Sequence, residues 1–238
     1  MSSTQAAKSS AVLVGVAAAS LGVIYGYDTS NIAAAKDFIR ADFGLGDGMT
    51  QALATVVVVG EILGAIAGGW FANKVGRRRA MISVGAGYTL FALFGALAPT
   101  VPLLLVARFL LGLTVGVSVV VVPVFVAESA PAKRRGAMLV AYQFATIVGI
   151  ILGYILGYLL AGMGTTSWKW MLGLAAVPAI IVTLLLVRLP DTARWYMTRG
   201  REHEARAALI SVEPDSTAAD IEAELDEMRA QLSDESGG

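Results

Sequence analysis

Six apolar stretches of about 20 residues each leave this chain little choice of fold, because a helix of about that length spans the hydrocarbon core of a bilayer. The stretches lie at approximately residues 11–33, 50–72, 80–98, 103–127, 138–162 and 170–189. The sequence therefore predicts an all-α membrane protein, with a bundle of six transmembrane helices over residues 11–189.

Composition excludes several other classes of protein. Hydrophobic residues make up 56% of the chain and charged residues 15%, whereas a soluble domain has about 25% charged residues. Basic and acidic residues number 18 each, so no net charge attracts nucleic acid. The chain has no cysteine and one histidine, too few for the usual zinc ligand sets. We therefore predict no enzyme activity, no metal and no cofactor.

The distribution of Lys and Arg predicts the orientation in the membrane. Of the 18 basic residues, 14 lie in the amino tail, the second and fourth loops and the carboxyl tail. By the positive-inside rule, both termini are cytoplasmic in the cell membrane, and residues 1–10 form a cytoplasmic tail. A cleaved signal peptide ending near Ala33-Ala34-Ala35 is the alternative. The length of the first apolar run and the five spans after it favour a retained span.

Small residues recur at intervals of four within three of the spans. This spacing places them on one face of a helix and allows helix backbones to approach closely in lipid. The glycines are Gly60, Gly64 and Gly68, then Gly112 and Gly116, then Gly149, Gly153 and Gly157. The pattern predicts close helix packing rather than direct contact with a ligand.

Residues 190–232 have a soluble character and predict a cytoplasmic helical segment, followed by a disordered tail over 233–238. Thr217 and Asp220 have the spacing of a capping box and indicate a helix start. The helix then carries one apolar stripe, made of Ile221, Leu225, Met228 and Leu232. This stripe has three possible surroundings: it contacts the cytoplasmic ends of the spans, it contacts another chain, or it faces solvent.

Three ionisable residues lie inside the predicted spans, where charges are rare and usually functional. Asp28 in the first span and Arg108 in the fourth have a similar depth, because the two spans run in opposite directions. An ion pair at this depth is either a static structural contact or a proton-carrying site, since loss of a partner changes the affinity of a carboxylate for protons. Glu61 in the second span has no evident partner, and its role stays open.

Six motifs follow one another in order along residues 11–200. They are Gly26-Tyr27-Asp28-Thr29, residues 69–78, Ala107-Arg108-Phe109, residues 128–136, Tyr142-Gln143-Phe144, and residues 168–171 with 189–195. This series resembles the amino-terminal six-helix half of the sugar porter family, within the major facilitator superfamily. The chain departs from the family at Asn73, where the family has Asp, and at three positions in residues 189–195.

The resemblance implies roles for single residues. Asp28 would accept the coupling proton with Arg108 as its partner. Gln143 would hydrogen-bond sugar hydroxyls, beside Tyr25 and Ile150. A further set would form a cytoplasmic charge network that latches the outward-open state, although its arginines also serve as topology determinants. This set comprises Asn73, Arg77, Arg78, Glu128, Arg135, Asp191 and Arg194.

Length is the main departure from the family. A sugar porter contains two six-helix halves, each made of inverted three-helix repeats, around a central site. This chain contains one. We therefore expect half of a sugar transporter, with sugar, proton and the lipid bilayer as partners. The second half would come from another chain or from a copy of this one. A truncated or regulatory membrane protein that docks to a partner without transporting is the alternative.

Overall fold

A computed structural model describes residues 3–129, 135–187, 191–212 and 216–236. Every regular element in these residues is helical, which confirms the predicted all-α class. The elements are α1 (Ser3–Phe43), α2 (Asp47–Val75), α3 (Arg77–Ala96), α4 (Val101–Ser129), α5 (Arg135–Leu160), the 3₁₀ turn η1 (Ala161–Met163), α6 (Ser167–Leu174), α7 (Ala176–Leu186), α8 (Ala193–Thr198), α9 (Glu202–Val212) and α10 (Ala218–Ser236).

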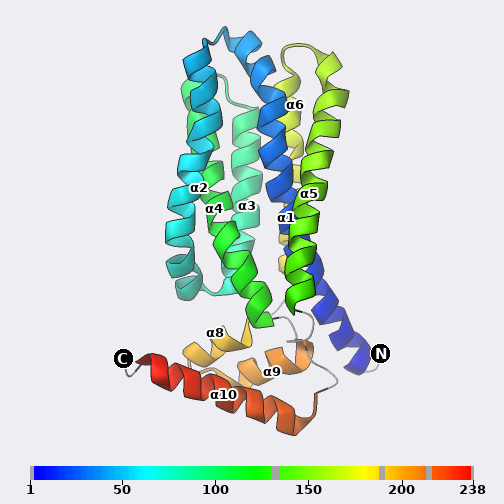
Figure 1. The fold of residues 1–238 in the computed structure, drawn as a ribbon, viewed down its shortest axis with the longest axis vertical. Helices are drawn as coiled ribbons and strands as arrows, with labels where there is room; N and C mark the ends of the chain where they lie inside the picture. Colours follow the sequence, from blue (N-terminus) through cyan, green and yellow to red (C-terminus); the bar gives the residue numbers. More distant parts are fainter. Residues whose placement is uncertain (1–2, 130–134, 188–190, 213–215, 237–238) are drawn as a thin grey trace.

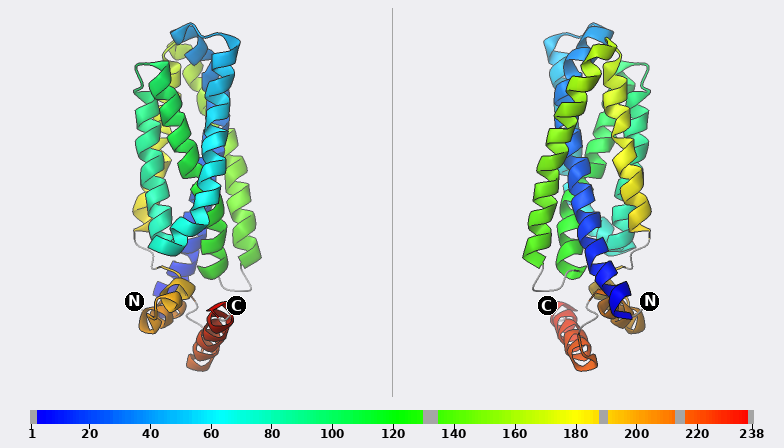
Figure 2. Two further views of the ribbon diagram at one scale, coloured as in Figure 1. Left: turned by 90° about the vertical axis from the view of Figure 1, so that its left-hand side faces the viewer. Right: turned by 90° about the vertical axis from the view of Figure 1, so that its right-hand side faces the viewer.

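The helices α1 to α7 stand side by side as an upright bundle, and α8, α9 and α10 gather at one end of it (Figure 1). The chain also begins and ends at this end, as the two side views show (Figure 2). We call it the terminal end of the bundle. Termini on the same side are what an even number of spans requires.

Five helical segments are long and apolar enough to cross a membrane. They are Asp47–Val75, Arg77–Ala96, Val101–Ser129, Gly136–Met163 and Ser167–Leu186, and they contain five of the six expected spans. The remaining one, residues 11–33, belongs to α1. The side chains of residues 1–14 lie outside the described part of the chain, but α1 runs along the bundle beside α5 (Figure 1).

The glycine series lie where helix backbones touch. A β-carbon on Gly60 would overlap the carbonyl oxygen of Phe109, and one on Gly112 would overlap that of Val57, so α2 and α4 are in direct contact. Gly149 lies in the same way against Val23, between α5 and α1. Without a hydrophobic driving force in lipid, this close packing supplies much of the attraction between helices. The predicted role of the glycines is confirmed.

We expect Gly60→Ala to destabilise the bundle, because the new methyl group would push α2 away from α4. Overpacking of this kind costs about 1–3 kcal/mol, which corresponds to a fall of roughly 2–12 °C in the midpoint of thermal unfolding. Gly69→Ala on the same helix is the control, since a β-carbon there meets no atom within 4 Å. Equal midpoints for the two variants in lipid nanodiscs would contradict the prediction.

The last expected span, 170–189, is not a single regular helix. It begins earlier, at Ser167, and is interrupted at Ala175 between α6 and α7. Pro178 is the physical reason, because its ring excludes a regular helical position for the carbonyl four residues before it. The amide of Ala175 instead bonds the carbonyl of Leu172, so the carbonyl of Met171 is left available.

At the terminal end, the apolar stripe of α10 packs against other helices of its own chain. Ile221 and Leu225 are buried and Met228 is half-buried, in a cluster with apolar residues of α8 and α9. The helix α10 continues to Ser236, into the residues for which the sequence predicts a disordered tail. Residues 218–236 contain no proline or glycine that would end the helix sooner.

The capping box of α10 is present. The amide of Thr217 donates to Asp220 Oδ2 at 2.8 Å and its hydroxyl donates to the same oxygen at 2.7 Å, while the amide of Asp220 donates to Thr217 Oγ1 at 3.2 Å. The hydroxyl bond first, and then the amide bond, hold the pKa of the Asp220 carboxyl below its ordinary value. The contact therefore stabilises α10 above that ordinary value and is lost as the pH falls through the lowered pKa.

This linkage predicts a measurable titration. In the native chain, the Asp220 carboxyl should titrate below about pH 3.9, the ordinary value for Asp, in a carbon-13 NMR series. Thr217→Val removes the hydroxyl and should move the midpoint back towards that value. Thr198→Val on α8 is the control and should leave it in place. A midpoint that is the same in the native chain and in Thr217→Val would show that the cap does not act on Asp220.

Candidate functional site

The centre of the candidate site is a buried ion pair between α1 and α4. Nη1 of Arg108 donates to Asp28 Oδ1 at 2.9 Å, and the two residues are 1% and 3% exposed. The structure thus joins two residues that the sequence placed at matching depth. Removal of one partner of such a pair strongly destabilises the fold, since a buried charge is then left uncompensated.

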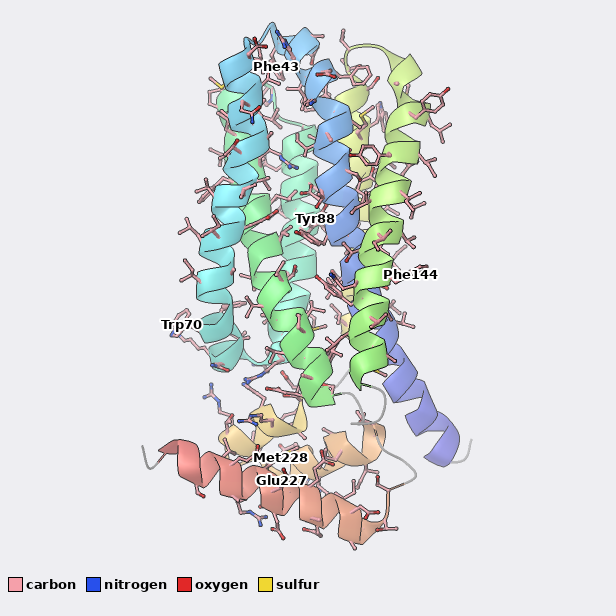
Figure 3. The ribbon with its side chains drawn as sticks, viewed as in Figure 1. Phe43, Trp70, Tyr88, Phe144, Glu227 and Met228 are labelled. Carbon is pink, nitrogen blue, oxygen red and sulfur yellow. The ribbon has the colours of Figure 1, made fainter. Side chains whose placement is uncertain are left out.

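The pair leaves several buried polar atoms without a partner among the described residues. They are Nε and Nη2 of Arg108 and the hydroxyl of Tyr88. Tyr88 comes from α3, is 1% exposed and lies at the centre of the bundle (Figure 3), near enough to interact electrostatically with Asp28. Sequence reasoning missed Tyr88, because an aromatic residue in an apolar span resembles ordinary core. The buried site therefore contains hydrogen-bond donors that have no acceptor among the described residues.

Side chains of α1 next to the pair anchor it to α6. The hydroxyl of Tyr27 donates to the carbonyl of Met171 at 3.0 Å, and Nδ2 of Asn31 donates to the same oxygen at 2.7 Å. This carbonyl is the one that the break before α7 leaves available. The two bonds hold α1 in the rotation that turns Asp28 inward, and neither residue was predicted to contribute.

The three candidate sugar contacts are not all at one place. Gln143 is exposed on α5, whereas Tyr25 and Ile150 are half-buried. Gly26, next to Tyr25, packs against the backbone of Ile150, where α1 and α5 touch. Tyr25 and Ile150 are thus neighbours, while Gln143 lies two turns along α5.

A second polar cluster joins the helix ends at the terminal end of the bundle. Arg77 at the start of α3 pairs with Glu128 at the end of α4, with Nη2 3.0 Å from Oε1 and Nε 3.0 Å from Oε2. Thr192 donates its hydroxyl to Glu128 Oε2 at 2.7 Å. Asp191 Oδ1 accepts from the amides of Arg78 at 3.1 Å and of Thr192 at 3.0 Å. These contacts tie α3, α4 and α8 together.

The short link between α2 and α3 depends on glycine. Gly76 has φ of 100°, a conformation that residues with a β-carbon avoid. A β-carbon at this position would also overlap the carboxylate of Asp191. Glycine therefore allows the link to turn and allows Asp191 to approach it.

Two other members of the predicted charge network, Asn73 and Arg194, line a cavity together with Arg77. Arg194 Nη1 donates to Gln231 of α10 at 3.1 Å. Asn73 is exposed and contributes its backbone carbonyl, which accepts from Trp195 Nε1 and from Arg199 Nη2, each at 3.4 Å. The side chain of Arg135 lies outside the described residues. Thr192, whose hydroxyl donates to Glu128, was not among the predicted members of the network.

No group of three His, Cys, Asp or Glu residues in the described part of the chain is placed to hold a metal ion. The polar chemistry of the described bundle is concentrated in the buried ion pair and the cluster at the terminal end. The ion pair lies between helices and the cluster joins helix ends, so helix movement would rearrange both. This arrangement is typical of a membrane transport protein.

The comparison with solved structures defines the class. The proton:xylose symporter XylE, bound to 6-bromo-6-deoxy-D-glucose, matches with a TM-score of 0.88 and 25% identity, over 97% of this chain and 55% of that chain. XylE from E. coli in an inward open conformation shares the fold, with a TM-score of 0.81 over 92% of this chain. The chain is an integral membrane protein with the fold of one half of a major facilitator transporter.

Sequence comparison gives the family. The profile described as "Sugar (and other) transporter" matches residues 14–237, so this chain belongs to the sugar transporter family. The galactose-proton symporter of Escherichia coli is 33% identical over 215 residues, which are 90% of this chain and 46% of that protein. The probable inositol transporter 2 of Arabidopsis thaliana is 36% identical, over 86% of this chain and 35% of that protein.

These relatives confirm the resemblance seen in the motifs, and they are transporters rather than enzymes. The arabinose-proton symporter of E. coli is 32% identical over 95% of this chain and 47% of its own length. The chain therefore spans about half the length, or less, of the curated relatives that it matches, and corresponds to their amino-terminal half.

Proposed function

We propose that this chain is the amino-terminal half of a proton-coupled sugar transporter of the cell membrane, which works with a second six-helix half. The observation that carries the proposal is the buried pair of Asp28 and Arg108 within a fold and family that contain sugar-proton symporters. The second half is not among residues 1–238, and both ends of this segment face the cytoplasm.

In this proposal, proton coupling works by breaking the ion pair between Asp28 and Arg108. Asp28 as a carboxylate holds Arg108, whereas protonated Asp28 has lost the charge that attracts the guanidinium. The hold between α1 and α4 then weakens. Because alternating access moves one half of a transporter against the other around a central site, this step links proton uptake to helix movement.

The polar cluster of Arg77, Glu128, Asp191 and Thr192 is proposed to close the cytoplasmic side. It lies at the terminal end of the bundle, between the ends of α3, α4 and α8. A latch at the opposite end from the sugar entrance stabilises the outward-open state.

The least buried helices indicate where the second half docks. The apolar windows of α2 and α5 are each 28% buried, against 61% for α4. Trp70 on α2 and Phe144 on α5 both point away from the bundle (Figure 3). We propose that parts of these two faces contact the second half and that the rest contacts lipid.

Gln143 is proposed to bind sugar in the assembled transporter, because an amide both donates to and accepts from hydroxyls. Loss of a hydrogen bond to a buried group costs about 1–3 kcal/mol, so Gln143→Ala should raise KM for the sugar by roughly 5- to 100-fold. Gln51→Ala, at an exposed position on α2, is the control. A change of less than about twofold, well below that range, would remove Gln143 from the sugar site.

The proposed function is tested by reconstitution in liposomes with an imposed proton gradient and labelled galactose, arabinose or xylose. One arm contains this chain alone, separated into monomer and dimer, and the other adds a carboxyl-terminal half from a sugar porter. Saturable uptake with the second half or by the dimer supports the proposal. Uptake by the monomer would refute the need for a second half. Absence of uptake in every arm would favour a non-transporting membrane protein.

A further inference from the structure

A second carboxylate, that of Glu61 on α2, lies within electrostatic range of the buried pair. Glu61 is half-buried, and its side chain makes no ion pair or hydrogen bond with the residues that the structure describes. It interacts electrostatically with both Asp28 and Arg108. Because a carboxylate within a span is unfavourable without a partner and is usually functional, its position next to the pair requires an explanation.

Backbone packing directs Glu61 towards the pair. The helices α2 and α4 run in the same direction and touch along Gly60, Gly64 and Gly68. Gly116 of α4 lies against the backbone of Glu61, where a β-carbon would overlap the carbonyl oxygen. Arg108 is two turns nearer the N-terminal end of α4. Side chains on a helix lean towards its N-terminus, so Glu61 leans in the direction of Arg108.

The charges and donors of the cluster are complementary. Arg108 bonds Asp28 through Nη1, and its buried Nε and Nη2 have no partner within the described bundle. Glu61 offers two acceptor oxygens, and a guanidinium has enough donors to hold a second carboxylate. The other titratable groups around the cluster are the phenols Tyr25, Tyr27 and Tyr88. A neutral phenol cannot neutralise Arg108 in place of a carboxylate.

We propose that Glu61 is a positioning residue that takes over the Arg108 guanidinium when Asp28 is protonated. Protonation then replaces an ion pair between α1 and α4 by one between α2 and α4, so the buried cation is never left unpaired. The hold on α1 is released in the same step. The proposal rests on the proposed role of Asp28 as proton acceptor.

Thermal unfolding of the purified chain in lipid nanodiscs tests this exchange without any transport assay. Asp28→Asn stands for the protonated acid, and Glu61→Gln removes the second carboxylate. In the Asp28→Asn background, Glu61→Gln should lower the unfolding midpoint by roughly 3 °C or more. In the native background, it should leave the midpoint unchanged or raise it. Asp37→Asn, an exposed acid of α1, is the control and should shift both backgrounds equally.

A second background keeps the test decisive if Asp28→Asn/Glu61→Gln does not fold. In Asp28→Asn/Arg108→Met the cation is absent, so Glu61→Gln should no longer destabilise and should raise the midpoint. An equal effect of Glu61→Gln in every background would overturn the proposal, because residues that do not interact give additive changes. Sugar accumulation by Asp28→Asn is a separate measurement, so failure of the proposed function is recognised independently.

Discussion

Asp28→Asn is expected to abolish uphill accumulation of sugar while sugar exchange across the membrane continues. Asn keeps the size of the side chain and its acceptor oxygen, but it cannot take up a proton at the position that Arg108 neutralises. The sugar site and the movement of the two halves would remain. The measurement is uptake of labelled galactose by the assembled transporter in proteoliposomes, with an imposed proton gradient and then by counterflow without one.

The same experiment decides between the two interpretations of the buried pair. Asp37→Asn removes an exposed acid from the same helix and should accumulate sugar as the native protein does. Unchanged accumulation by Asp28→Asn would make the pair a static structural contact. Loss of both accumulation and counterflow would indicate a damaged fold rather than lost coupling.

Arg108→Met is expected to cause the largest loss of stability of any single substitution considered. It leaves the Asp28 carboxylate, which is 3% exposed, without its cation. Breaking a buried pair in this way costs about 3–5 kcal/mol, which corresponds to a fall of roughly 6–20 °C in the unfolding midpoint for a chain of this size. Tryptophan fluorescence of the chain in nanodiscs during heating measures it.

The double variant Asp28→Asn/Arg108→Met should recover most of this loss, because neither charge is then left unpaired. Arg79→Met, which removes an exposed arginine of α3, controls for the loss of a positive charge. If the double variant were as unstable as Arg108→Met alone, the instability would come from lost packing of the arginine rather than from an uncompensated carboxylate.

The sequence by itself determined the class of fold and the main ion pair. Apolar runs of about 20 residues allow little besides membrane-spanning helices, because backbone groups in lipid must be satisfied within the segment. Depth along two such helices was enough to match Asp28 with Arg108, since rise per residue is constant. The capping box at Thr217 and the glycine contacts were likewise predictable, because each depends on spacing within one helix.

Only the tertiary structure decided which residues from different helices meet. Tyr88 lies buried at the centre of the bundle, within electrostatic range of Asp28, and Thr192 donates to Glu128, because helix rotation and packing bring them there. The same holds for the Met171 carbonyl, which receives Tyr27 and Asn31 after the helix breaks.

The apolar stripe of α10 shows most clearly what a sequence pattern leaves undetermined. Its spacing predicts a buried face, but not whether the spans, another chain or solvent lies opposite. In the structure, Ile221 and Leu225 pack against α8 and α9 of the same chain. Periodicity along one helix specifies which face is apolar. The partner of that face depends on contacts between segments distant in sequence, which the pattern does not contain.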